Sequence, residues 1–212
     1  MGKRIEREMN AAFCERAKKP LRRKKELILL MLETLKLFYI EEISCEVQGK
    51  VIITIEKMRR INYFMKDKFF SFYFPFSAEV TEEGIRIYDP VSDIEIDNRM
   101  LSAMILILGR YDERTGNIET MYDNYCEDVC EEGMEDIAEK AWETLLRSIA
   151  AEPGYIRYDY DEEHADKRIH PLHHLDVNYS SECTYKIGLP GEVQREEFLD
   201  LLDIRKPCRY LA

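Results

Sequence analysis

The segment YIRYDYDEEHADKRIHPLHHLDVNYSSECTYKIG, residues 155–188, contains three runs with the alternating, aromatic-rich character of β-strands. The runs cover 155–161, 173–179 and 183–188, and polar loops separate them. Successive strands that are joined by loops rather than by helices favour antiparallel pairing. We therefore predict a three-stranded antiparallel unit, and an amphipathic helix over 192–204 follows it to give a histidine-containing strand–helix unit over 155–204.

The chain before this unit contains further strand signals. Aromatic residues fill the run at 69–74, and two pairs of short β-prone runs each flank a glycine-containing turn. The paired runs lie at 43–47 and 51–55, around the turn at 48–50, and at 79–81 and 85–88, around the turn at 82–84. Glycine supplies the backbone freedom that a tight turn needs. These signals predict an antiparallel meander of about four strands.

Helical periodicity occupies the rest of the chain. Apolar residues recur at helical spacing over 21–39, 100–108, 120–130 and 134–151. The prediction is an α+β fold with about six to seven antiparallel strands and flanking helices. At 212 residues we expect a single domain over 1–212. The pattern leaves open whether the strands form one sheet or two.

Charge is distributed unevenly along the chain. Residues 1–25 carry a net charge of +7, whereas the remaining residues carry −18. We predict that residues 1–25 form a basic N-terminal helical arm. This arm either binds nucleic acid or an acidic partner, or its charges are solvated or paired with the acidic remainder of the chain. The overall charge of −11 opposes unaided binding of nucleic acid by the rest of the chain.

Targeting signals and membrane spans are not evident in the sequence. No unbroken apolar run exceeds six residues, as at 103–108, and a bilayer-crossing helix needs about 20. The N-terminus is charged from Lys3 onward and lacks the apolar stretch of a secretory signal. Six scattered cysteines are typical of reduced cytosolic thiols. We expect a cytoplasmic protein without a membrane partner.

All the histidines of the chain lie within eleven residues, at His164, His170, His173 and His174. Because side chains alternate along a strand, His174 and Asp176 project from one face, and Arg157 and Asp159 share a face of the preceding strand. Pairing of these strands would gather Asp159, Asp161, His174 and Asp176, with His170 at the rim. Imidazole and carboxylate together suit zinc, manganese or iron, of which we favour zinc or manganese. The candidate metal ligands are Asp159, His170, His174 and Asp176.

The same residues support readings without a metal. His170 or His174 can act as a general base that Asp159 or Asp176 orients, with Arg157 stabilising an anion. These five residues are therefore also the candidate catalytic residues. A third reading is that histidine and aspartate on a sheet face are simply solvated.

The segment 156–202 resembles a prokaryotic domain-of-unknown-function family. The shared elements are an Arg-x-Asp-Tyr-Asp strand, here at 157–161, a His-Pro-x-x-His-hydrophobic-His strand, here at 170–176, a Cys or Arg near a Pro, here Cys183 and Pro190, and a Phe-containing helix, here at 196–199. The last motif histidine is Asp176 in this chain, and an aspartate can replace histidine as a metal ligand. The resemblance implies a bacterial protein of mobile genetic islands or phage-defence neighbourhoods.

Two functional hypotheses follow. The first is a defence- or toxin-like protein that hydrolyses a phosphodiester in RNA or DNA, with a divalent metal at the His/Asp strand face. The second is a non-catalytic component of a multi-protein defence complex, which acts through protein–protein contacts. The sequence contains no Walker loop, Gly-x-Gly-x-x-Gly fingerprint or Gly-x-Ser-x-Gly elbow, so we expect neither nucleotide binding of those kinds nor α/β-hydrolase chemistry.

Overall fold

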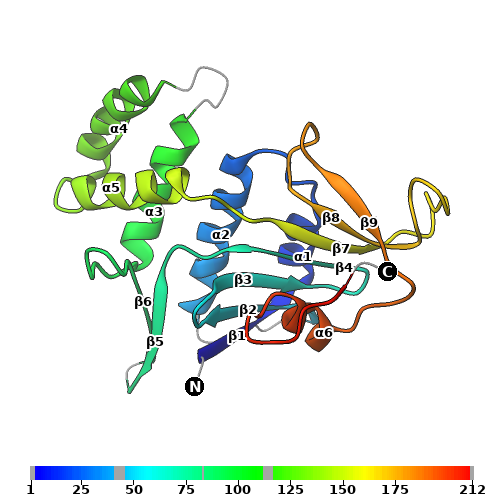
Figure 1. Ribbon diagram of the computed structural model, residues 1–212. Helices are drawn as coiled ribbons and strands as arrows, with labels where there is room; N and C mark the ends of the chain where they lie inside the picture. The colour runs from blue at the N-terminus through cyan, green and yellow to red at the C-terminus, as the bar shows by residue number, and fades with distance from the viewer. Residues whose placement is uncertain (1–2, 41–45, 83, 112–116, 211–212) are drawn as a thin grey trace. The chain divides into compact units, whose positions relative to one another are not determined.

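A computed structural model describes residues 3–40, 46–82, 84–111 and 117–210 of the chain (Figure 1). Over these residues it contains strands and helices in the mixed order that the sequence predicts, and the α+β class is confirmed. The elements are β1 Lys3–Asn10, α1 Ala11–Lys18, α2 Lys24–Phe38, β2 Val47–Ile55, β3 Arg59–Phe64, β4 Lys68–Tyr73, β5 Ser77–Thr81, β6 Gly84–Tyr88, α3 Asn98–Arg110, α4 Ile118–Glu132, α5 Ala138–Ala150, β7 Ile156–Tyr160, β8 His173–Val177, β9 Tyr185–Gly188 and α6 Arg195–Leu201.

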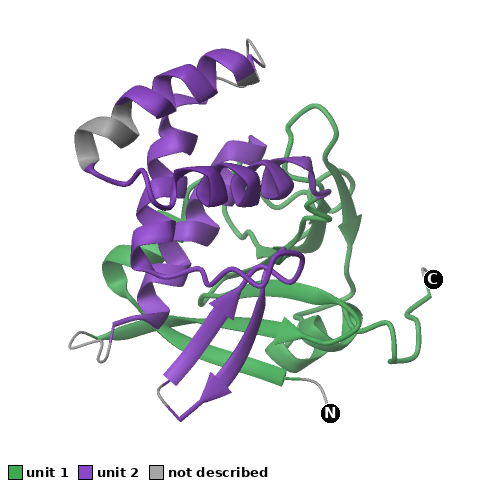
Figure 2. Ribbon diagram, turned by 90° about the vertical axis from the view of Figure 1, so that its left-hand side faces the viewer, with its two compact units in different colours: residues 1–22, 43–74, 153–212 green, residues 23–42, 75–152 purple. Residues whose placement is uncertain are grey.

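The chain divides into two compact units, each built from separate stretches of sequence (Figure 2). Unit 1 comprises residues 1–22, 43–74 and 153–212, and unit 2 comprises residues 23–42 and 75–152. All the residues of the histidine-containing strand–helix unit, 155–204, belong to unit 1. The expectation of one domain over 1–212 stays a prediction.

Unit 1 contains a seven-stranded antiparallel sheet in the order β1-β2-β3-β4-β7-β8-β9. The pairing of β4 with β7, in which Phe70 lies opposite Arg157, joins the strands of the first half of the chain to those of the last third. This pairing answers the question that the sequence left open. The strands of unit 1 form one sheet, and β5 and β6 pair separately in unit 2.

One face of this sheet is apolar and is covered by α6. Phe198 and Leu199 of that helix pack with Phe64, Tyr158 and Leu175 in a buried cluster. The helix begins after Gln194, whose backbone N–H donates to the Glu197 carboxylate in a capping arrangement that satisfies an otherwise unpaired donor. Because this face is buried, the alternate residues of β7 and β8 must point to the other face of the sheet.

The other face changes its chemistry across the sheet. On β3 and β4 it presents Tyr63 and Phe70, which stack with ring centroids 4.5 Å apart and are fully buried. On β7 the same face continues as Arg157 and Asp159, because Arg157 is the direct neighbour of Phe70 across the β4–β7 ladder. The face is therefore an aromatic core at one side and a polar surface at the other.

Unit 2 is mainly helical. α3 packs against α2, α4 and α5, and its buried residues include Leu101, Met104 and Ile107. Asp97 accepts a hydrogen bond from the backbone N–H of Met100 and so caps the N-terminus of α3. No helix in the described part of the chain is long and apolar enough to cross a membrane.

Two sequence predictions of local structure are wrong. Residues 3–10 of the expected basic helical arm form strand β1, and the helix there covers only Ala11–Lys18. Residues 47–55 form one continuous strand, so Gly49 is not in a turn. Residues 43–45 of the expected hairpin lie outside the described residues. In β1 the buried side chains are Ile5 and Met9, and their spacing of four residues fits a helix as well as a strand.

Candidate functional site

The register of three neighbouring strands gathers the candidate residues on one face of the sheet. Asp159 lies directly opposite His174 between β7 and β8, and Arg157 lies opposite Asp176. On the far side of β8, Asp176 lies opposite Lys186 of β9. The shared face that strand alternation predicts for Asp159, His174 and Asp176 is confirmed.

Asp159, His174 and Asp176 form a compact cluster, here named the Asp–His–Asp group. Each offers one ligand atom, and these atoms all lie within 4.8 Å of one another. His174 Nε2 is 3.8 Å from an oxygen of Asp159 and 3.9 Å from an oxygen of Asp176. His174 is fully buried and Asp176 is 4% exposed. The group can hold a metal ion, as the sequence predicts for these three residues.

The environment of His174 determines which ring nitrogen carries the proton. Its Nδ1 lies 2.8 Å from the carbonyl oxygen of Pro171, which can only accept a hydrogen bond, so Nδ1 is assigned the proton. Burial lowers the pKa of His174 below its ordinary value and favours the neutral ring. The Nε2 atom therefore presents a lone pair to the two carboxylates, which is the form in which histidine binds metals.

Arg157 bridges the two carboxylates of the group. Its Nε donates to Asp159 Oδ2 at 2.6 Å, and a terminal nitrogen donates to Asp176. Burial alone would lower the pKa of Arg157, but Asp159, Tyr155 and Asp176 raise it above its ordinary value. The guanidinium is thus a fixed positive charge beside the Asp–His–Asp group.

Lys186 supplies a second cation that the sequence analysis missed. Its Nζ lies 2.9 Å from His174 Nε2 and donates to Asp176 Oδ1 at 2.8 Å. Alternation in β9 carries a signal for this residue, because Tyr185 and Ile187 share one face and Lys186 must point to the other. Its position opposite Asp176 depends on the β8–β9 register, which the sequence does not specify.

His170 lies beside the Asp–His–Asp group but pairs elsewhere. Its Nε2 is 3.2 Å from Asp161 Oδ2, and the other Asp161 oxygen contacts His164 Nδ1 at 3.1 Å. The His170 and His174 rings are perpendicular, with centroids 4.7 Å apart. The structure thus places His170 with Asp161, and its ring packs against the Asp–His–Asp group without joining it.

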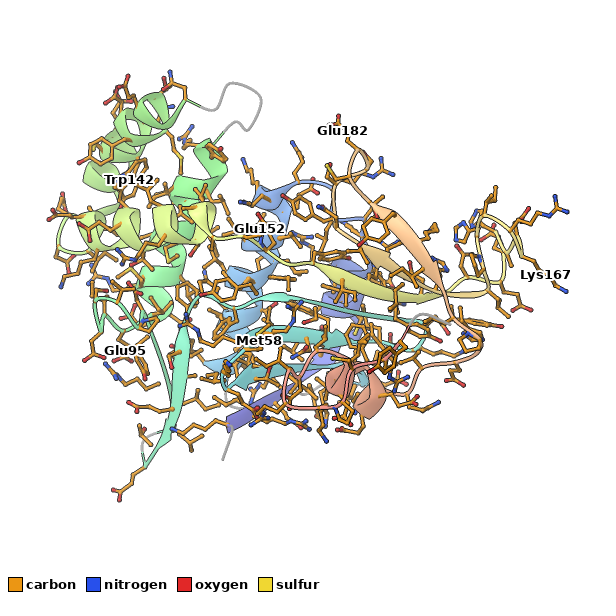
Figure 3. The ribbon with its side chains drawn as sticks, in the orientation of Figure 1. Met58, Glu95, Trp142, Glu152, Lys167 and Glu182 are labelled. Atoms are coloured by element: carbon orange, nitrogen blue, oxygen red, sulfur yellow. The ribbon has the colours of Figure 1, made fainter. Side chains whose placement is uncertain are left out.

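Asp159 and Asp176 line an open cleft of about 870 Å³ in unit 1, and the buried His174 lies behind them. Residues of the loops after β7 and β8 also line it. Figure 3 shows the two loops, with Lys167 in the first and Glu182 in the second. The cationic side chains of the cleft are Lys18, Arg22, Lys68, Arg157 and Lys186, and the acidic ones are Asp67, Asp159, Asp161, Glu163 and Asp176. Part of the basic N-terminal segment therefore lines the same cleft as the candidate ligands.

Lys68 is a second amine of the cleft with a distinctive environment. Burial and, to a smaller extent, the positive charge of Arg157 lower its pKa to about 8, although Asp159 and Asp176 act in the opposite direction. Its Nζ donates to the carbonyl oxygen of Lys18 at 3.1 Å. Lys68 faces the same side of the sheet as Asp159, which lies opposite it between β4 and β7.

Comparison with known proteins identifies no relative. No family model matches the chain, and neither the curated proteins nor the solved structures contain a match. Any function assigned to the cleft must therefore be argued from its own residues.

Proposed function

We propose that this chain is a cytoplasmic bacterial hydrolase of phosphodiesters that uses a divalent transition metal, zinc or manganese, at the Asp–His–Asp group. The observation that carries the proposal is the position of His174 Nε2, which lies 3.8 Å from a carboxylate oxygen of Asp159 and 3.9 Å from one of Asp176. Ligands at about 2.1 Å around a tetrahedral ion are about 3.4 Å apart. Small side-chain movements thus suffice to close the three donors around an ion.

The roles of the residues follow from their charges. A divalent ion held in this position would polarise a phosphoryl oxygen and lower the pKa of a bound water. Arg157, held by the two carboxylates, presents its guanidinium to the cleft and stabilises charge that develops on the phosphoryl oxygens. Lys68 and Lys186 add further donors beside it. Asp159, His174 and Asp176 bind the ion, and Pro171 positions the His174 ring through its carbonyl group.

The surrounding cations support a nucleic-acid substrate. Lys18 and Arg22 come from the basic segment that the sequence singled out, and both line the cleft. Phosphate contacts by lysine and arginine supply most of the sequence-independent affinity for nucleic acids. The proposed substrate is therefore a phosphodiester of RNA or DNA, within the defence- or toxin-like setting that the family resemblance implies.

The test is hydrolysis by the full chain after removal and re-addition of metal. Bis(p-nitrophenyl) phosphate and fluorescent single-stranded RNA and DNA oligonucleotides serve as substrates, with Mn²⁺ or Zn²⁺ or with EDTA. We expect metal-dependent cleavage that Asp176→Asn and His174→Gln each reduce by at least about a hundredfold. Asp67→Asn, which removes an acid of the same cleft that lies outside the group, is the matched control and should retain activity. Metal binding without cleavage of any substrate overturns the proposal.

A second candidate function is a non-catalytic component of a protein complex. One observation favours it: Arg157 and Lys186 neutralise Asp159 and Asp176, so the network is closed without any ligand. Such a network can have a purely structural role, in which it holds β7, β8 and β9 together. In that case the Asp176→Asn and His174→Gln variants lose stability or partner binding, and neither the parent nor the variants bind a stoichiometric metal.

A further inference from the structure

The ammonium group of Lys186 occupies the position in which a metal ion bound to the Asp–His–Asp group would lie. It is 2.9 Å from His174 Nε2 and 2.8 Å from Asp176 Oδ1, so it engages the imidazole lone pair and one of the two carboxylates. Arg157 also contacts both carboxylates of the group, but no hydrogen bond joins it to His174 among the described residues. Of these two cations, only Lys186 contacts His174 Nε2, the ring nitrogen through which His174 would bind a metal ion.

The position of Lys186 allows its side chain to move away from the Asp–His–Asp group. β9 is the last strand of the sheet, and the Lys186 side chain is 30% exposed and lines the open cleft. Pairing with Asp176 in the β8–β9 ladder holds the backbone, while the unbranched four-carbon stem can swing. Displacement of the ammonium thus requires no change in the sheet.

The charges show what displacement achieves. With Lys186 in place, the charges of Arg157 and Lys186 balance those of Asp159 and Asp176. Without it, the group and Arg157 carry one net negative charge and an uncovered imidazole lone pair. The site then attracts a divalent ion more strongly, and the released ammonium stays in the cleft where a phosphate would lie.

We propose that Lys186 is a tethered cation that occupies the Asp–His–Asp group in the absence of metal and is displaced into the cleft when a divalent ion binds. This inference rests on the proposed metal site and makes Lys186 a determinant of its affinity. A metal ion must break two charged hydrogen bonds to enter, which weakens binding by at least about tenfold.

The test compares metal affinities of the full-length chain and of Lys186→Met by calorimetric titration with Mn²⁺ and with Zn²⁺. Lys167→Met is the control, because it removes the same charge from an exposed residue of unit 1 that does not line the cleft. We expect Lys186→Met to bind at least about tenfold more tightly than the parent, and Lys167→Met to bind within about threefold of it. Lys186→Arg, which keeps the charge, should bind no more tightly than the parent.

The outcomes separate this inference from the function on which it rests. If the parent binds metal, Asp176→Asn does not, and Lys186→Met shows the parental affinity or a weaker one, the tethered-cation role is wrong while the metal site stands. If neither the parent nor Lys186→Met binds either ion, both proposals fail. Melting curves of each variant establish that the protein titrated is folded.

Discussion

Asp159 and His174 are direct partners across the β7–β8 ladder, and their side chains approach to 3.8 Å on one face of the sheet. Because backbone hydrogen bonds on both sides hold β7 and β8, the spacing of these groups is set by the sheet rather than by a loop. Sites on rigid strands are better preorganised than sites on loops. The consequences of this placement can be measured residue by residue.

Substitution of Asp176 should destabilise the fold as well as the metal site. Asp176 is 4% exposed and accepts hydrogen bonds from Arg157 and Lys186, so Asp176→Asn leaves two cations without their shared counter-charge. Breaking a partly buried ion pair costs about 3 kcal/mol. Urea unfolding at pH 7 should show this loss in Asp176→Asn and no measurable change in Asp67→Asn, whose side chain is exposed. Equal stability of the two variants would contradict the network.

Anion binding in the cleft should depend on metal. The cleft contains five cationic and five acidic side chains, so its charge is balanced, and a bound divalent ion makes it positive. We expect a fluorescent oligonucleotide to bind at least about tenfold more tightly with Mn²⁺ than with EDTA, and to weaken as salt rises. Fluorescence anisotropy measures both effects. Asp176→Asn should abolish the metal enhancement, and equal affinity in EDTA and Mn²⁺ would argue against a metal-dependent substrate site.

Lys68 should give the protein an unusual dependence of stability on pH. Its pKa is about 8 in the folded chain, whereas an unfolded lysine titrates near 10.5. Between these values the unfolded state binds the extra proton, so the contribution of Lys68 to the free energy of unfolding rises from about pH 8 to about pH 10.5. Below pH 8 the charged lysine costs stability.

The comparison of the parent with Lys68→Met isolates this effect from other titrating groups. The variant should be more stable than the parent at pH 7, and the difference should shrink toward pH 10. Denaturant unfolding at pH 7, 8.5 and 10 measures it. A difference that is constant across this range would show that Lys68 has an ordinary pKa in the folded state.

Gly49 should tolerate no side chain. A Cβ atom there would lie 2.7 Å from Met9 Cε, 2.8 Å from the Phe64 carbonyl oxygen and 2.9 Å from Cys14 Sγ. Because a backbone oxygen cannot yield as a flexible side chain can, Gly49→Ala should destabilise the fold by about 1–3 kcal/mol. Gly109 in α3 has nothing within 4 Å of its Cβ position, so Gly109→Ala should stabilise by up to about 1 kcal/mol. Thermal melting of both variants tests the contrast in sign.

Strand alternation was sufficient to place Asp159, His174 and Asp176 on one face, because that property depends only on a period of two residues. The role of Lys186 could not be predicted in this way, since it follows from the register between β8 and β9. Register depends on tertiary packing, here on the apolar face that α6 covers. Sequence patterns therefore identified most of the cluster but missed its second cation.

Strand β3 was missed for a different reason. Arg60 and Asn62 interrupt its apolar residues and make 57–62 look like a polar loop. In the structure both side chains are buried and their N–H groups find acceptors: Arg60 donates to Ser71 and to the Gly154 carbonyl, and Asn62 donates to the Ile52 carbonyl. Composition cannot predict such partners, because they come from distant positions in the chain.

Unit 2 contains a buried ion pair whose loss should be measurable by itself. Asp89 is 4% exposed and accepts hydrogen bonds from Ser92 Oγ at 2.7 Å and from the backbone N–H of Val91 at 3.1 Å, and it pairs with Arg147 of α5. Burial by itself would raise the pKa of Asp89, but Ser92, Val91 and Arg147 lower it below its ordinary value. A carboxylate with a lowered pKa stabilises the fold above about pH 4, and this contribution is lost as the pH falls further.

Arg147→Met should therefore destabilise the protein by about 2–3 kcal/mol at pH 7, because it leaves Asp89 buried with its charge only partly compensated. The deficit relative to the parent should decrease as the pH falls below about 4, where Asp89 takes up a proton in the variant first. Arg99→Met, which breaks the exposed pair with Asp136 in the same unit, should leave unfolding unchanged. Denaturant unfolding of the three proteins at pH 7 and pH 3.5 makes the comparison. Equal losses in the two variants would mean that burial of Asp89 contributes nothing to the strength of its pair with Arg147.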